Sequence, residues 1–559
     1  MTKKFRIFAT NFKTNHFTRQ TMKKTIAIAI AAFCCITANA QEINAVVTRQ
    51  GTTNKNCYQL SSQPSVVFGE DNTITVKEGE TTKEEYTLSE SNTLTVLFGS
   101  AISNEVNAED LEVAYPIYIM NNGKLTVSGT MANANAEDLV IEDGGQLRFE
   151  NGTVKAQAKK EITGYSEGNG NWYLVASPVA EATPTAVGMI DQTTPENYDL
   201  YAFDQTGDDE GKEWLNNKVQ GQEIESLEIQ NGYLYANKNG TTLVFDGQLA
   251  ATATAKNLDF DANAQFKGFN LIGNPYTCDA YINRNFYRMN DEEGKEGTEL
   301  ILSSGAIHAL EGVFVQALDE DESVTFSKDA PTTQNGMCAM TLSQGTANID
   351  RAIVNFGKGG SLDKFMLDPT HTNIRLDKNG EEYAAISTSS TSGEIPVSFK
   401  AAKDGNYTIT VNTENVEAEY LHLIDNLTGA DVDLLAAAAS TGSASTTGSA
   451  STTGSASTTG SASYSFEAKT DDYASRFKLV FDVKDDAASA GSAGDFAFIS
   501  NGEIIISNED RATLQVVDVL GRIVSSEEIN GDCRISTNGL TAGVYILNLN
   551  GMTQKIVVK

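Results

Sequence analysis

The sequence predicts an all-β, multidomain protein. Gly is frequent, at 46 of 559 residues, and Val, Ile and Thr recur in short runs that alternate apolar and polar positions. No long stretch of apolar residues repeats at the 3.6-residue period of an amphipathic helix. A chain of this length is too long for one core and fits roughly three to five domains of about 100–150 residues each. We therefore expect strands joined by tight turns, with few and short helices.

The stretch MKKTIAIAIAAFCCITANA, which begins at Met22, has the three parts of a secretory signal. Two lysines precede an apolar run of about eleven residues, which is too short to span a bilayer. Ala38 and Ala40 then form an Ala-x-Ala cleavage pattern. We expect residues 1–40 to be removed, so that the mature chain begins at Gln41. The true start of translation is either the first residue or, more simply, Met22.

Residues 41–160 repeat at an interval near 20 residues, which fits the rungs of a β-solenoid. The segments NTITVKEG, from Asn72, and SNTLTVLFG, from Ser91, carry Asn-Thr pairs 20 residues apart. NNGKLTVSG and DGGQLRFENG place Leu125 22 residues before Leu147. Such rungs are stable only when stacked. An array of antiparallel hairpins is the alternative.

Residues 163–250 and 262–330 are predicted to be two copies of one β-module. GNWYLVASPVAE matches KGFNLIGNPYTC, with Trp172 97 residues before Phe269. YDLYAFD then aligns with NFYRMND, and NGYLYANKNGTTLVFDG with EGVFVQALDEDESVTFSK. Matching blocks in the same order indicate a duplication. We expect Trp172 and Phe269 to anchor matching cores.

Residues 337–485 are predicted to form a β-sandwich domain that the run 440–463 interrupts. This run holds three perfect copies of STTGSA and is expected to be a coil about 25–30 Å from end to end. A domain boundary at the run would leave 464–485 as a lone hairpin, which is unstable in water. An insertion costs little, because loop-closure entropy grows only logarithmically with length. We therefore place the linker at 486–493.

Residues 494–559 are predicted to be a compact β-module. Strands are expected at Glu503–Ser507, Leu514–Val519, Gly543–Asn548 and Lys555–Val558. Alternation along the third of these puts Tyr545 and Leu547 on one face.

The blocks LQVVDVLGRIV, GLTAGVYILNL and QKIVVK in this module resemble the type A C-terminal sorting domain of the type IX secretion system of Bacteroidetes-type bacteria. The resemblance implies an Ig-like β-sandwich that directs export across the outer membrane of a Gram-negative-type envelope. The implied partners are the Sec translocon, the type IX secretion machinery and a sortase-like peptidase. The motif positions, with an implied role in folding and recognition, are Gly521, Arg522, Gly543, Tyr545 and Lys555. More loosely, NWYLVASP and GFNLIGNPY resemble modules of uncharacterised surface proteins of the same bacteria.

The charge and the cysteines exclude several other classes of function. Lys and Arg total 41 against 74 Asp and Glu, a net charge of −33, which repels phosphate backbones and anionic lipid headgroups. We therefore expect no nucleic-acid partner. Four cysteines remain after the signal and have no CxxC spacing: Cys57, Cys278, Cys338 and Cys533. Isolated buried thiols are favoured over a disulfide framework.

No motif predicts a catalytic or metal site, and we expect no cofactor. GYSEG fits the GxSxG pattern around Ser166 but lacks the preceding apolar strand and following helix of a nucleophile elbow. His308, His371 and His422 have no zinc-ligand spacing. Acidic loops that could hold Ca²⁺ are interpreted as solvated, since they lack EF-hand spacing. Their carboxylates are Asp204, Asp208, Asp209, Asp319 and Asp321.

We therefore expect an exported, non-enzymatic protein that acts at the cell surface or outside the cell in adhesion, by binding a glycan or a protein. One alternative is a glycan-acting enzyme that uses scattered carboxylates about 5–10 Å apart. Another is a glycan-binding module, which would show exposed coplanar aromatic rings. The candidate aromatic residues for such a platform are Trp172, Tyr173, Trp214, Tyr233 and Tyr235.

Overall fold

The computed structural model describes residues 42–558 apart from short gaps. The gaps are 51–52, 69–72, 88–93, 166–170, 208–211, 291–298, 332–335, 358–360, 367–369, 391, 417, 436–457, 484–496, 501–502, 507–510, 519–521, 531–532, 542 and 550–551. The predicted signal and its cleavage residues Ala38, Ala40 and Gln41 lie outside the described residues. The all-β prediction is confirmed, and the α-helix of the described chain is the single turn α1 (Pro184–Val187). The chain forms two compact units, unit 1 ending at Asp482 and unit 2 beginning at Val483.

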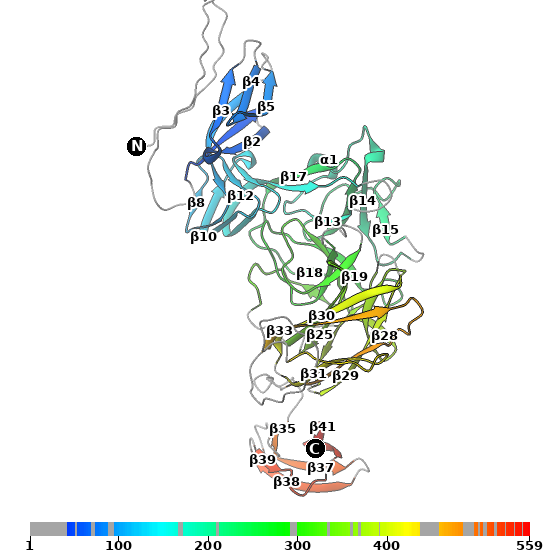
Figure 1. The fold of residues 1–559 in the computed structure, drawn as a ribbon. Helices are drawn as coiled ribbons and strands as arrows, with labels where there is room; N and C mark the ends of the chain where they lie inside the picture. The colour runs from blue at the N-terminus through cyan, green and yellow to red at the C-terminus, as the bar shows by residue number, and fades with distance from the viewer. Residues whose placement is uncertain are drawn as a thin grey trace, which may run out of the picture. The chain divides into compact units, whose positions relative to one another are not determined.

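Unit 1 begins with two antiparallel groups of strands, shown in blue in Figure 1. The strands are β1 (Ala45–Gln50), β2 (Thr53–Gln59), β3 (Pro64–Phe68), β4 (Thr73–Glu78) and β5 (Thr81–Thr87). The segment from Asn72, predicted to be a solenoid rung, instead becomes β4 of the sheet β3-β4-β5. The reason is the tight turn after β4. Gly79, at a φ of 58°, reverses the chain into β5, so the segment pairs with its own neighbour.

Parallel pairing begins at Ser100 and confirms the solenoid-like prediction for the residues that follow. The rung predicted from Ser91 is not part of it, because residues 94–99 pair antiparallel with β1. The strands are β6 (Leu94–Ile102), β7 (Glu105–Ala108), β8 (Leu111–Glu112), β9 (Ile117–Ile119), β10 (Lys124–Asn133), β11 (Leu139–Ile141) and β12 (Gln146–Ile162). Leu125 of β10 pairs with Leu147 of β12, and Leu139 of β11 pairs with Ile117 of β9, all in parallel. A Cβ on Gly145 would lie 2.6 Å from the Ile119 carbonyl oxygen. The repeated glycine therefore lets successive rungs stack closely.

The two modules have the same strand order. Copy 1 contains β13 (Tyr173–Ala176), β14 (Tyr198–Phe203), β15 (Trp214–Asn216), β16 (Gly232–Asn237) and β17 (Thr241–Gln248). Copy 2 contains β19 (Phe269–Gly273), β20 (Phe286–Met289), β21 (Leu300–Ser303), β22 (Gly312–Gln316) and β23 (Ser323–Val324), which pairs with β18 (Lys256–Asn257). The sheets run β13-β16-β14-β15 and β19-β22-β20-β21. In addition, β17 pairs with β12 and joins copy 1 to the solenoid.

The register of the second strands corrects one alignment. Tyr201 pairs with Leu234 in copy 1, and Tyr287 pairs with Phe314 in copy 2. Leu234 and Phe314 each lie opposite the leucine of the first strand of their copy. Tyr201 and Tyr287 are therefore equivalent, whereas aligning YDLYAFD with NFYRMND placed Tyr201 against Arg288. A shift of one residue turns every side chain to the other face of a strand, so packing decides the register.

The two copies are joined by reciprocal backbone contacts. The Ala176 amide donates to the Leu310 carbonyl oxygen at 2.9 Å, and the equivalent Gly273 amide donates to the Gln230 carbonyl oxygen at 2.9 Å. A Cβ on Gly312 would lie 3.2 Å from the Cα of Gly232, its equivalent in copy 1. Each contact is repeated between the equivalent residues of the two copies, so the copies are related by a local two-fold axis.

One aromatic core lies between the copies. Trp172 and Phe269, expected to anchor two matching cores, both belong to it. The prediction was wrong because the same face of each sheet turns toward the other copy, while separate cores lie behind each sheet. The segment 361–366 closes copy 2: Phe365 stacks 4.8 Å from Phe269, and the Tyr287 hydroxyl donates to the Asp363 carbonyl oxygen at 2.9 Å.

The last part of unit 1 is one continuous sheet of eleven strands. Its strands are β24 (Gly336–Gln344), β25 (Ala347–Phe356), β26 (Leu362–Asp363), β27 (Asn373–Lys378), β28 (Glu381–Thr388), β29 (Ser392–Lys400), β30 (Gly405–Val416), β31 (Ala418–Asp425), β32 (Asp431–Asp433), β33 (Thr458–Ala468) and β34 (Phe477–Val483). Phe399 of β29 and Phe466 of β33 lie far apart in the strand order, yet their rings are 5.2 Å apart. The sheet therefore folds over on itself around its core, which also buries an ion pair between Arg476 and Asp425 at 3.0 Å.

The end of the STTGSA run is a strand and not the expected coil. Residues 458–463 form the start of β33, which pairs with β30, while β34 pairs with β29. Strand pairing needs backbone hydrogen bonds but no large side chains, and here small residues fit both faces. Ala462 is buried, and the Ser463 hydroxyl lies 3.0 Å from that of Thr410. Residues 436–457 lie outside the described chain.

Cys57, Cys278 and Cys338 are free thiols. Cys278 and Cys338 are buried, and Cys57 is partly buried. Burial raises the pKa of the Cys278 and Cys338 thiols to about 12, so both are protonated at neutral pH.

Unit 2 consists of a three-stranded and a four-stranded antiparallel sheet, coloured orange to red in Figure 1. The strands are β35 (Ala497–Ser500), β36 (Glu503–Ile506), β37 (Arg511–Asp518), β38 (Ile523–Asn530), β39 (Cys533–Ser536), β40 (Gly543–Leu549) and β41 (Met552–Val558). The inner faces of the two sheets share one core, to which Ile504, Leu514 and Leu547 contribute. The unit therefore has its own core and strand pairing.

The close approach of the copies predicts a sharp difference between two glycines. Gly273→Ala should lower the free energy of unfolding by about 1–3 kcal/mol, because its Cβ would lie 2.4 Å from the Asn231 carbonyl oxygen. Gly305→Ala is the control, since nothing lies within 4 Å of its Cβ position, and should change stability by less than about 0.5 kcal/mol. Thermal unfolding of the mature chain measures both. Equal melting temperatures would contradict the two-fold packing.

The strand at the end of the repeat predicts that copies of STTGSA are not equivalent. Deleting one copy, residues 445–450, should change loop-closure free energy by only about 0.3 kcal/mol. Ala462→Asp should destabilise the domain by about 2 kcal/mol or more, because it buries a carboxylate between paired strands. Urea unfolding of both variants distinguishes them. A large loss of stability on deleting one copy would rule out this assignment.

Candidate functional site

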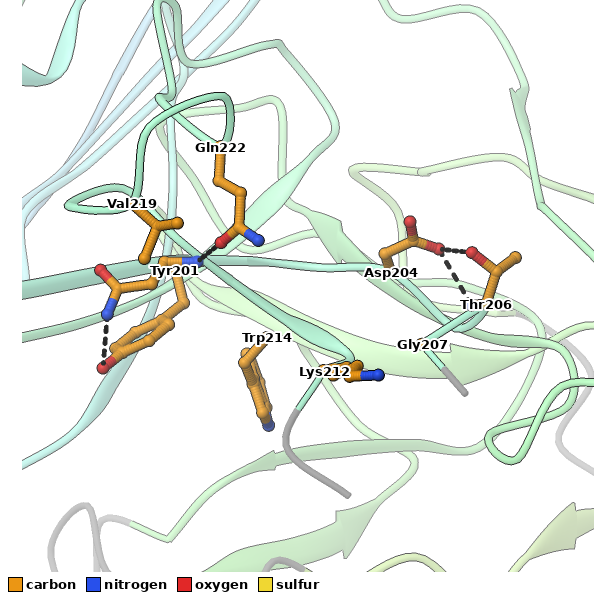
Figure 2. A pocket seen from close by; sticks show the side chains of 9 residues that line it. Tyr201, Asp204, Thr206, Gly207, Lys212, Trp214, Val219 and Gln222 are labelled. Atoms are coloured by element: carbon orange, nitrogen blue, oxygen red, sulfur yellow. Dashed lines mark hydrogen bonds between the residues drawn. The ribbon is translucent and has the colours of Figure 1, made fainter. Parts of the chain in front are cut away.

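An open hollow of about 460 Å³ lies beside the second and third strands of copy 1. Tyr201 of β14 and Trp214 of β15 contribute its aromatic side chains, and Figure 2 shows Asp204 and Thr206 across from them. The remaining residues that line it are Gly207, Lys212, Asn216, Val219 and Gln222. The hollow combines two aromatic side chains with amide, carboxylate and ammonium groups and is open to solvent.

The polar groups of the hollow are held by local hydrogen bonds. The Asp204 carboxylate accepts from the backbone amide of Thr206 at 2.9 Å and from its hydroxyl at 2.7 Å. The side-chain oxygen of Gln222 accepts a hydrogen bond from the backbone amide of Asn216 at 2.8 Å. These contacts fix the rim before any ligand arrives. Sequence patterns had pointed to Trp214 and Asp204, but not to Asn216 or Gln222, which reach the hollow only through the fold.

The aromatic residues predicted for a sugar-binding platform do not form one. Tyr233 and Tyr235 are buried in β16, at 4% and 0% exposure. The rings of Tyr201 and Trp214 are 6.4 Å apart and meet at 80°, edge to face. Edge-to-face packing stabilises a core and does not provide the coplanar ring faces of a sugar-binding platform.

The histidines and acidic clusters do not assemble a metal site in the described chain. Among the residues that the structure describes, no group of three or more His, Cys, Asp or Glu side chains could hold a metal ion. His308 instead contacts Asp279 at 3.0 Å, His371 contacts Glu299 and His422 contacts Asp431. The hydrogen bond to Asp279 raises the pKa of His308 above its usual value. Ser166, Asp208 and Asp209 lie outside the described residues.

The motif residues of unit 2 separate into an inner and an outer group. Tyr545 is buried, and its hydroxyl donates to the Thr541 carbonyl oxygen at 2.8 Å. Arg522 is 73% exposed and forms an ion pair with Asp518 at 2.7 Å. Lys555 is exposed on β41. Tyr545 therefore serves folding, whereas Arg522 and Lys555 are available to a partner.

The structure does not explain the two glycines of the sorting motif. The Cβ position of Gly543 has ordinary space, with the Thr541 carbonyl oxygen nearest at 3.8 Å, and nothing in the structure explains a glycine there. Gly521 lies outside the described residues.

Residues 500–559 match the family model of the secretion system C-terminal sorting domain. Unit 2 carries a type IX sorting domain. No curated protein and no solved structure matches the chain. The sorting domain directs the protein through the type IX secretion machinery to the outer-membrane surface or the extracellular space of Bacteroidetes. Among the described residues, the helices lack the length and apolar character needed to span a bilayer.

The inner and outer motif residues predict different effects on the sorting domain. Tyr545→Phe should destabilise it by about 1 kcal/mol, because the Thr541 carbonyl oxygen loses its hydroxyl donor. Arg522→Ala should cost less than about 0.5 kcal/mol, since exposed ion pairs contribute little. Limited proteolysis of the full chain across a urea series reports unfolding of residues 497–558. A larger loss of stability from Arg522→Ala than from Tyr545→Phe would contradict the assignment of Tyr545 to folding and of Arg522 to the exposed group.

Proposed function

We propose that the exported protein is a non-enzymatic binding protein, acting in adhesion at the bacterial surface, and that copy 1 holds its ligand in the hollow beside Tyr201 and Trp214. The N-terminal residues before Gln41 would act as its Sec signal. A sortase-like peptidase would process the sorting domain after export. An extracellular glycan or a protein segment is the ligand class that aromatic faces with polar rims accommodate.

The difference between the two copies carries this proposal. Tyr287 of copy 2 is fully buried, its hydroxyl bonded to the 361–366 segment of the same chain. Its equivalent in copy 1, Tyr201, lines the open hollow instead. A duplicated aromatic position has thus been used for internal packing in one copy and left accessible in the other.

The lining of the hollow favours binding over hydrolysis. Glycoside hydrolysis uses two carboxyl groups about 5–10 Å apart. Among the described residues that line the hollow, Asp204 supplies the one carboxylate, and two hydrogen bonds from Thr206 hold it in place. A glycan-acting enzyme would need a second carboxylate there.

The copies supply matched variants for a binding test. Trp214→Leu introduces the type of residue that copy 2 has at the equivalent Leu300, and should weaken binding to any ligand found on glycan and host-protein arrays by about tenfold or more. Trp172→Phe is the control: it introduces the residue type of Phe269 at a position outside the hollow lining, although its ring packs 5.9 Å from that of Tyr201, and it should retain binding.

Both variants are assayed as the mature full chain, with melting temperatures recorded alongside. Binding that survives Trp214→Leu would reject the hollow as the site. Release of product from a polysaccharide or protein substrate by the purified chain would replace the binding function with an enzymatic one.

A further inference from the structure

The outer face of the four-stranded sheet in the sorting domain carries a row of apolar side chains. Val517 of β37 pairs with Ile523 of β38 on one side and with Ile546 of β40 on the other. Ile546 in turn pairs with Lys555 of β41. Directly paired residues of antiparallel strands point to the same face. The row therefore crosses all four strands and ends in a lysine.

These side chains are exposed to an unusual degree for their type. Ile523 is 55% exposed, Val524 beside it 44%, and Ile546 42%. Their neighbours Leu514, Val516 and Leu547 on the same strands are at most 1% exposed. The domain thus already has a complete core on its inner face, and the outer row contributes nothing to it. Clustered exposed apolar groups of this kind mark interaction surfaces.

The row is a patch with a defined border. One step along the strands, the paired positions are polar: Gln515 faces Ser526 and Asn548, and Asn548 faces Thr553. At the other border stands Arg522, the residue before Ile523, bonded to Asp518. Lys555 is not seen in any ion pair with the described residues. In a chain of net charge −33, the patch therefore combines apolar side chains with a positively charged ammonium group.

We propose that this patch, formed by Val517, Ile523, Val524, Ile546 and Lys555, is the surface by which the sorting domain docks on the type IX secretion machinery. The complementary surface would present apolar side chains bordered by carboxylates, which would pair with Lys555 and exclude other acidic exported proteins that lack the patch. This inference rests on the sorting function. It explains why two motif positions, Arg522 and Lys555, lie at the patch while Tyr545 serves the core.

The test is export of the full chain from a type IX-competent cell, measured as the fraction accessible to external protease on intact cells. The double variant Ile523→Asp with Ile546→Asp should reduce the exported fraction about tenfold, because it places charges within an apolar contact. Lys555→Glu should reduce the exported fraction by a smaller factor, about threefold. This single variant still tests the proposal if the double variant is degraded in the cell. A chain ending at Val483 should remain unexported.

The matched control changes charge on the same face without touching the patch. Ser526→Asp with Thr553→Asp introduces two carboxylates on the polar row and should leave export unchanged. Protease resistance of residues 497–558 in each variant establishes that the domain has folded.

The outcomes separate the surface from the sorting function. Normal export of the chain ending at Val483 would overturn the sorting function itself. Retention of that chain together with normal export of the patch variants would overturn the docking surface alone. A wild-type dimer that the double variant dissociates without affecting export would assign the patch to self-association and would also reject the proposal.

Discussion

The close contact between Gly232 and Gly312 is the constraint on which the packing of the two module copies depends. Because neither glycine has a Cβ, the backbones approach closely enough for the reciprocal bonds from Ala176 and Gly273 to form. That approach turns the same face of both sheets inward and seals the aromatic core between them. Larger residues there would hold the sheets apart, and the core would be open to water.

The same symmetry makes the difference between the copies informative. Copy 2 carries the 361–366 segment over its aromatic face, and the Gln316 side chain accepts from the Asp363 amide at 2.9 Å. At the position equivalent to Leu300, copy 1 instead has Trp214, which faces the hollow. The equivalent aromatic face is thus covered by the same chain in copy 2 and lines an open hollow in copy 1. This division requires no change of fold.

The sorting domain divides its surfaces in a comparable way. Its inner face supplies the hydrophobic core of the domain, and the apolar side chains of the outer face do not pack in that core. Ile523 and Ile546 remain exposed there although both belong to well-formed strands. An exposed apolar side chain lowers solubility and is retained where a partner covers it. Export and the proposed ligand binding would therefore depend on different parts of the chain.

The sequence by itself determined the all-β class and the sorting motif, and it predicted the module duplication and the stacked rungs that the structure shows from residue 100, since these depend on alternation, spacing and turn residues near in the chain. Local spacing could not show that β4 folds back on β5, that Tyr201 matches Tyr287, or that residues 458–463 join a sheet. Those outcomes depend on which distant strand supplies hydrogen bonds and which face finds a partner. For the same reason, no sequence motif predicts that Asn216 and Gln222 line the hollow. Tertiary structure alone decides such long-range pairings, because a strand has no preferred partner until its apolar face is buried.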